Sequence, residues 1–137
     1  MTMRPLLLAS FLLAAPAIAG DVSQVDVAQA EAKLSRLTKG QAAGASVRCI
    51  RPEGIVLPEA INGRALAYRT PRALYVGPLR AAGTDAGGCP WLREGRTFVT
   101  SSINGQLCAG DRVRIVETGM LLGQCVFGPF TPYMKAK

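Results

Sequence analysis

The side chains of this sequence that are capable of chemistry include acids, serines, cysteines, lysines and arginines, and histidine is absent. Without histidine the chain lacks the commonest general base and metal ligand, so Ser101 and Ser102 have no partner for a histidine-based triad. A glycosidase-type hydrolase would need two carboxylates about 5–10 Å apart. Six acids are candidates: Glu53, Glu59, Asp85, Glu94, Asp111 and Glu117. Because no spacing singles out a pair, we predict no catalytic residue, metal site or cofactor, and keep an acid-based envelope hydrolase as an alternative.

The four cysteines, Cys49, Cys89, Cys108 and Cys125, are separated by 40, 19 and 17 residues. These gaps contain no Cys-x-x-Cys redox motif and no short paired spacing typical of zinc. In an oxidising compartment an even number of cysteines predicts two disulfides, for which three pairings exist. Cys89 and Cys108 flank one predicted strand, whereas Cys49 and Cys125 open and close the β-rich part. We therefore predict the nested pairs Cys49–Cys125 and Cys89–Cys108.

Arginine dominates the charge of the chain. Lys and Arg together number 16 against 9 Asp and Glu, a formal net charge of +7, and residues 46–134 contain ten arginines but no lysine. Arg112 and Arg114 alternate with apolar residues and so share one strand face, while Arg69 and Arg72 flank a predicted turn. Because guanidinium groups bind phosphate and carboxylate groups in a forked geometry, we predict that these four form an anion-binding patch. The alternative is that the excess of arginine reflects the base composition of the genome and serves only the solubility of the protein.

The first residues are typical of a leader for export. Arg4 precedes an apolar run that is broken at Pro16, and Ala17-Ile18-Ala19 places small residues where signal peptidase requires them. The run is shorter than the roughly 20 residues that span a bilayer. We predict a signal peptide over residues 1–19, and a periplasmic or secreted mature chain without a transmembrane anchor. Export also removes nucleic acid as a physiological partner.

The mature chain divides into two parts. Residues 20–45 are predicted to form a helix and a linker, because Val22, Val25, Ala28 and Ala32 recur near helical spacing and Gly40 follows as a helix-ending glycine. The apolar stripe is narrow and rich in alanine, so we expect this helix to pack lightly against the rest or to project from it. A small-residue linker follows at 41–46.

Residues 46–137 are predicted to form a disulfide-bonded β domain. Short apolar runs are bounded by turn residues at 55–57, 65–68, 74–76, 97–99, 113–116 and 125–127. Tight turns are predicted at Asn62-Gly63 and Asn104-Gly105, a hairpin around Pro71, and another turn within 119–123. Asp111 is predicted to form a turn by accepting backbone N–H bonds. The fold class is α+β, mainly β: a short N-terminal helix, then a small antiparallel β barrel or sandwich.

Several segments recur together in a known group of proteins. They include the run Asn62–Arg69, the Leu-Cys-x-Gly-Asp element at 107–111 and the Phe-x-Pro-Tyr element at 130–133, alongside the four cysteines. Over most of residues 40–133 the chain resembles a family of small exported alphaproteobacterial proteins of the sphingomonad type, whose four-cysteine domain has no assigned function. The resemblance implies a one-domain periplasmic protein with a disulfide-bonded β fold. It implies no catalytic residues.

These observations favour a non-enzymatic periplasmic protein. Its expected role is to bind an anionic cell-envelope component through an arginine-rich face, or to contact another envelope protein. A purely structural or protein-interaction domain is the alternative.

Overall fold

The computed structural model describes residues 21–52, 57–84 and 87–136, and the side chains from residue 27 onward within these ranges. The predicted leader at 1–19 and residues 55 and 56 of the first predicted strand lie outside the described residues.

The prediction of a mainly β, α+β chain is confirmed. The elements are α1 (Asp21–Leu37), β1 (Gln41–Ala43), β2 (Cys49–Ile50), β3 (Glu59–Ile61), β4 (Ala65–Arg69), β5 (Leu74–Ala81), β6 (Thr97–Thr100), β7 (Leu107–Cys108), β8 (Arg112–Glu117), β9 (Met120–Phe127) and β10 (Thr131–Lys135). No helix of the described residues has the length and apolarity to cross a membrane.

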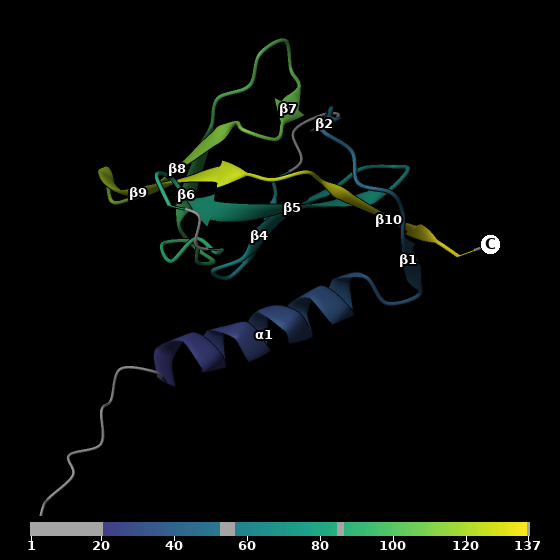
Figure 1. Cartoon of the computed structure of the whole chain (residues 1–137), viewed down its shortest axis with the longest axis horizontal. Helices are drawn as coiled ribbons and strands as arrows, with labels where there is room; N and C mark the ends of the chain where they lie inside the picture. Colours follow the sequence, from purple (N-terminus) through teal and green to yellow (C-terminus); the bar gives the residue numbers. More distant parts are fainter. Residues whose placement is uncertain (1–20, 53–56, 85–86, 137) are drawn as a thin grey trace, which may run out of the picture.

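Strand β5 is the centre of an antiparallel sheet (Figure 1). Along one edge it pairs with β4, which in turn pairs with β3. Along the other edge its first half pairs with β10 and its second half with β9. The sheet then branches, since β10 continues to β1 while β9 continues to β8 and β6. Strands β2 and β7 form a separate two-stranded sheet.

Strands β9 and β10 behave as one partner strand with a break. The pairs Leu79↔Phe127 and Val76↔Thr131 differ in register by one residue, so the chain between them carries one extra residue, as at a β-bulge. Phe130 is thereby displaced from β5 and exchanges two backbone hydrogen bonds with Val47, each 2.8 Å long. This places Phe130 in the core.

The inner face of the sheet carries the larger hydrophobic core. Phe127, Phe130, Leu66, Val113 and Ile115 are at most 2% exposed, and Tyr68 packs against the two phenylalanines at ring-centroid distances of 6.4 and 6.5 Å. Glycine is required at two places on this face. A Cβ at Gly77 would come within 2.5 Å of the Phe130 ring, and one at Gly123 within 2.2 Å of the ring of half-buried Trp91.

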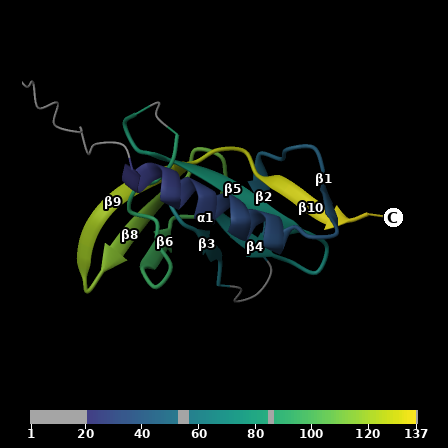
Figure 2. The ribbon, with the colours of Figure 1, turned by 90° about the horizontal axis from the view of Figure 1, so that it is seen from below.

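Helix α1 covers the opposite, outer face of the sheet (Figures 1 and 2). Ala30 is 1% exposed and packs with the small side chains Ala65 and Ala67 of β4, with Leu34 and Leu37 at the edge of the contact. Alanine on both surfaces permits this contact, so the helix packs on the sheet rather than projecting from it. Gly40, at φ 74°, follows the helix in the left-handed region, as predicted.

The turns are partly as predicted. Asn104 and Gly105 both have positive φ, 57° and 71°, between the bridged residues Ile103 and Gln106. Asp111 Oδ2 accepts a hydrogen bond of 2.7 Å from the backbone N–H of Cys108, which confirms its predicted role. The turn predicted within 119–123 is wrong in position: Thr118 and Gly119 form it, and Met120 already lies in β9.

The strands stop short of a closed barrel. Within the described part of the chain, β3 pairs only with β4 and β6 only with β8, so each leaves one edge without a partner. Five strands were missing from the sequence prediction, namely β1, β2, β3, β7 and β10, and residue 57 of the run predicted at 55–57 lies outside any strand. The predicted linker at 41–46 therefore contributes β1 to the sheet.

The two disulfides exist, but the predicted nested pairing is wrong. Cys49 is bonded to Cys108 and Cys89 to Cys125. The cause is strand pairing: Cys49 and Cys108 stand directly opposite each other in the β2–β7 sheet. Cys89 is held over β9 because its N–H donates to the carbonyl of Gly63, and both Cys89 and Cys125 are fully buried.

Candidate functional site

Two of the four predicted anion-binding arginines lie on β8. Arg112 and Arg114 are exposed on the outer face, because Val113 and Ile115 between them are fully buried on the inner face. Arg112 stands in register with Val126 of β9, which stands in register with Arg80 of β5. The prediction that the two arginines share one strand face is confirmed.

The other two arginines lie elsewhere on the same face. Arg69 is in register with Leu74, six residues along β5 from Arg80. At about 3.3 Å per residue, this separates the two pairs by roughly 20 Å along the strand, in addition to their separation across strands. The four arginines therefore do not form one patch, and the prediction that they do is wrong. The cause is that Arg69 and Arg72 lie at the beginning of β5, whereas β8 is connected through β9 to the end of β5.

Arg69 and Arg72 instead line a surface depression of about 370 Å³ together with Lys135, which we call the cationic hollow. Thr70, Tyr133 and Gln41 also line it, and none of its described lining residues is acidic. Arg69, Leu74, Tyr133 and Ala43 form one row across β4, β5, β10 and β1, and Gln41 stands opposite Lys135. Three positive side chains from two separate parts of the sequence thus meet at one end of the sheet.

The β4–β5 turn fixes the two arginines of the hollow. The N–H of Thr70 donates to the carbonyl of Ala73 over 2.9 Å, and the Thr70 hydroxyl donates to the same oxygen over 2.9 Å. Pro71 restricts the backbone between them, because its ring fixes φ. Arg69 ends β4 and Arg72 occupies the turn, and both are exposed.

Gln41 adds a second unusual feature to the cationic hollow. Its side-chain oxygen Oε1 is buried, and among the described residues no group donates a hydrogen bond to it. A buried polar atom without a partner is unfavourable and rare in folded proteins. A group that entered the hollow with a hydrogen-bond donor would relieve this cost.

Three of the six acids considered for hydrolysis make structural contacts. Glu117 pairs with Arg96, Asp111 binds backbone as described above, and Glu94 binds Lys33. Glu59 lies on β3, and Glu53 and Asp85 are outside the described residues.

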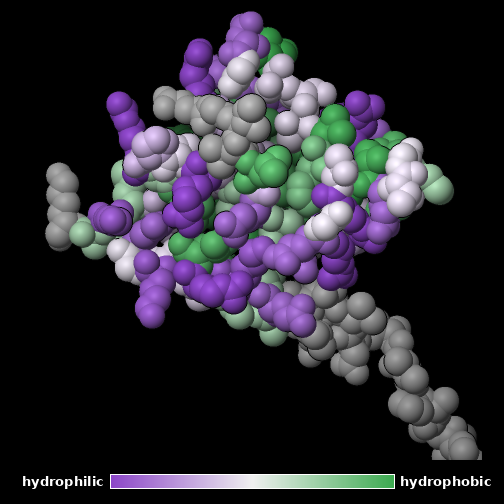
Figure 3. Space-filling view, turned by 180° about the vertical axis from the view of Figure 1, so that it is seen from behind, coloured by the Kyte–Doolittle hydropathy of each residue, from purple (hydrophilic) through white to green (hydrophobic). Residues whose placement is uncertain are grey.

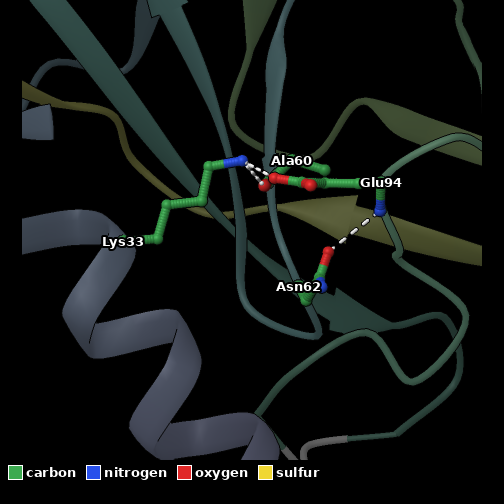
Figure 4. Close-up of polar contacts among 4 residues, drawn as sticks. All are labelled: Lys33, Ala60, Asn62 and Glu94. Atoms are coloured by element: carbon green, nitrogen blue, oxygen red, sulfur yellow. Dashed lines mark hydrogen bonds and ion pairs between the residues drawn. The ribbon is translucent and has the colours of Figure 1, made fainter. Parts of the chain in front are cut away.

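Glu94 is bound by Lys33, which extends from α1 (Figure 4). The Lys33 ammonium also donates to the Ala60 carbonyl oxygen of β3 over 2.7 Å, and the Glu94 N–H donates to Asn62 Oδ1 over 2.9 Å. The hydrogen bond and the positive charge of Lys33 lower the pKa of Glu94, more than its slight burial raises it. This lysine connects the helix, β3 and the segment before β6.

Sequence reasoning identified Arg69 and Arg72 but missed Lys135 and Gln41. Lys135 lies beyond the last predicted strand, at 125–127, and Gln41 was assigned to a linker. The two residues are brought together only by the pairing of β1 with β10. The available signal for a strand was the alternation of Thr131, Tyr133 and Lys135 with the apolar residues Pro132 and Met134.

No group of three or more Cys, Asp and Glu side chains within the described ranges is arranged to hold a metal ion. Comparison with protein-family models, with curated proteins and with solved structures finds no match for this chain. The resemblance to an exported alphaproteobacterial family remains a prediction.

Proposed function

We propose that this chain is an exported, non-enzymatic binding protein that holds an anionic component of the cell envelope in its cationic hollow. The observation that carries the proposal is the meeting of Arg69, Arg72 and Lys135 around one depression without a lining acid. Like charges at one site repel each other, and a bound phosphate or carboxylate group relieves that repulsion.

The chemistry of the hollow favours a particular kind of anion. Arginine offers forked donors to phosphate or carboxylate oxygens, and lysine adds a compact positive charge. The buried side-chain oxygen of Gln41 has no hydrogen-bond donor of its own among the described residues. A ligand that carries a hydroxyl or amine beside its anionic group can supply one, and therefore fits better than a bare anion. Phosphorylated sugars and glycerol phosphates combine these groups.

The chain provides a matched control for the experiment. Arg69→Gln with Arg72→Gln removes two charges from the hollow, while Arg112→Gln with Arg114→Gln removes two from β8, roughly 20 Å away along the sheet. Each forked charge-assisted contact contributes about 1.5–3 kcal/mol. We expect the first pair of substitutions to weaken binding by at least about tenfold, and the second pair to change it little.

The probes are glycerol phosphate, inorganic phosphate and purified lipopolysaccharide, and binding is measured by calorimetry at two salt concentrations. Tighter binding of glycerol phosphate than of inorganic phosphate, lost in the Arg69/Arg72 variant alone, supports the proposal. Equal losses in the two double variants would mean that net charge alone attracts the anions. That result, or binding unchanged in both, refutes the site.

A further inference from the structure

The two sheet edges without partners, those of β3 and β6, face each other across a groove. A depression of about 550 Å³ is lined by residues 57–60 on one side and 94–98 on the other. It adjoins an inner depression of about 290 Å³, and Pro58 and Phe98 line both. Asn62 and Glu94 are hydrogen-bonded at one end of this groove. We call it the seam. Figure 3 is viewed from the side of β3 and β6, where apolar side chains form separate groups among hydrophilic ones.

The two edges differ in how they are protected against pairing with another strand. Pro58 precedes β3, Glu59 begins it, and the Ala60 carbonyl already accepts a hydrogen bond from Lys33. Proline, charge and occupied backbone groups are the usual protection of an edge. Strand β6, with the sequence Thr-Phe-Val-Thr, contains neither proline nor a charged residue and consists of residues that favour β structure. Among the described residues, no group forms a hydrogen bond with its free edge. The free edge of β6 is therefore the one open to another strand.

The inner depression supplies a place for one side chain of an added strand. It is uncharged along its described lining, and Tyr68, Phe98 and Leu107 contribute apolar surface to it. The Tyr68 hydroxyl is buried and has no hydrogen-bond partner among the described residues, while the whole residue is 5% exposed. A segment that enters the depression with a hydrogen-bond acceptor would satisfy this hydroxyl.

We propose that β6 takes an extended, uncharged segment of another polypeptide as an added strand, one of whose side chains enters the inner depression beside Tyr68. Backbone pairing along an open edge supplies affinity, and a pocket for alternate side chains supplies specificity. A small molecule would use the depression but leave the edge of β6 unpaired, which is why a polypeptide fits the seam better. This inference does not rest on the cationic hollow, which lies on the outer face.

The test uses two substitutions on the same strand. Thr100 lies on the inner face, in register with buried Val113, and lines the inner depression. Val99 is also exposed but is in register with Arg114, on the other face of the strand, and it lines neither depression. Thr100→Lys places a charge where the added side chain must enter, whereas Val99→Lys adds the same charge to the outer face. We expect Thr100→Lys to weaken binding by at least about tenfold and Val99→Lys to have little effect.

The probe is a capped heptapeptide in which threonine alternates with valine, and glutamine, whose side-chain carbonyl oxygen can accept from the Tyr68 hydroxyl, occupies the centre. The control is the same peptide with proline at its centre, which cannot donate to a ladder. Hydrogen exchange of the β6 amides and a calorimetric titration are measured on the mature chain, and circular dichroism verifies the fold of each variant. Protection of β6 by the first peptide alone, lost in Thr100→Lys only, supports the proposal. Absence of protection in the wild type overturns it, as do equal losses in the two variants or a peptide-free dimer formed through β6.

Discussion

Tyr68→Phe provides a direct test of the energetic reasoning about the core. The substitution removes one hydroxyl and keeps the ring that packs against Phe127 and Phe130. The Tyr68 hydroxyl is buried without a partner among the described residues, and such a group costs about 1–3 kcal/mol of stability. We therefore expect the variant to be more stable than the wild type by that amount, with Tm raised by at least about 4 °C.

The same substitution has a distinct dependence on pH. Burial raises the pKa of Tyr68 above its ordinary value of 10.0. The unfolded chain releases this proton near pH 10 while the folded chain retains it, so stability falls as the pH rises above 10. The slope is up to about 1.4 kcal/mol per pH unit for one proton. Because Tyr75 and Tyr133 are present in both proteins, the difference between variant and wild type isolates Tyr68.

The assay is denaturant unfolding at pH 7 and at steps between pH 9.5 and 11.5. The advantage of the variant should be positive at pH 7 and should widen above pH 10. A variant that is less stable at pH 7 would show that the hydroxyl is satisfied in solution. A difference that stays flat through pH 11 would show that the folded chain ionises this residue freely.

Three further results are expected. Non-reducing peptide mapping should join Cys49 to Cys108 and Cys89 to Cys125, and a fragment that joins Cys49 to Cys125 would contradict the fold. Gly123→Ala should cost about 1–3 kcal/mol because its Cβ overlaps the Trp91 ring, whereas Gly87→Ala, which meets nothing within 4 Å, should cost less than about 0.5 kcal/mol. Glu94, whose pKa is lowered by Lys33, should stabilise the wild type relative to Glu94→Gln above about pH 4.3 and lose that effect as pH falls through the lowered value. Because the Glu94 side chain is 61% exposed, that difference should stay below about 1 kcal/mol and decrease in salt, as unfolding at pH 2–7 would measure.

Local patterns in the sequence predicted those elements whose signals are themselves local. The alternation around Val113 and Ile115 predicted both the strand and its buried face, and Asn104-Gly105 predicted a tight turn. The helix end at Gly40 follows from the same kind of short-range preference. These features depend on neighbours within a few residues.

The features that the sequence did not predict depend on which distant segments of the chain pair with each other. Residues 41–43, Gln-Ala-Ala, carry no strand signal of their own, and they are extended because they pair with the edge of β10. The Cys49–Cys108 bond follows from the β2–β7 pairing, which involves two residues on each side and is too short to detect by periodicity. The division of the four arginines into two pairs has the same origin, since register along β5 decides it.

The interleaved order of the two disulfides affects how the protein responds to proteolytic cleavage. With Cys49 joined to Cys108 and Cys89 joined to Cys125, a single cleavage anywhere between residues 49 and 125 leaves one covalent molecule. Two cleavages, one within residues 50–88 and one within 109–124, produce a middle fragment that contains Cys89 and Cys108. If these two cysteines were bonded to each other, as in the nested pairing, the middle fragment would be released. In this protein each of them is bonded to a different flanking fragment, so all three fragments stay joined. The crossed bonds thus retain fragments that a nested pair would release.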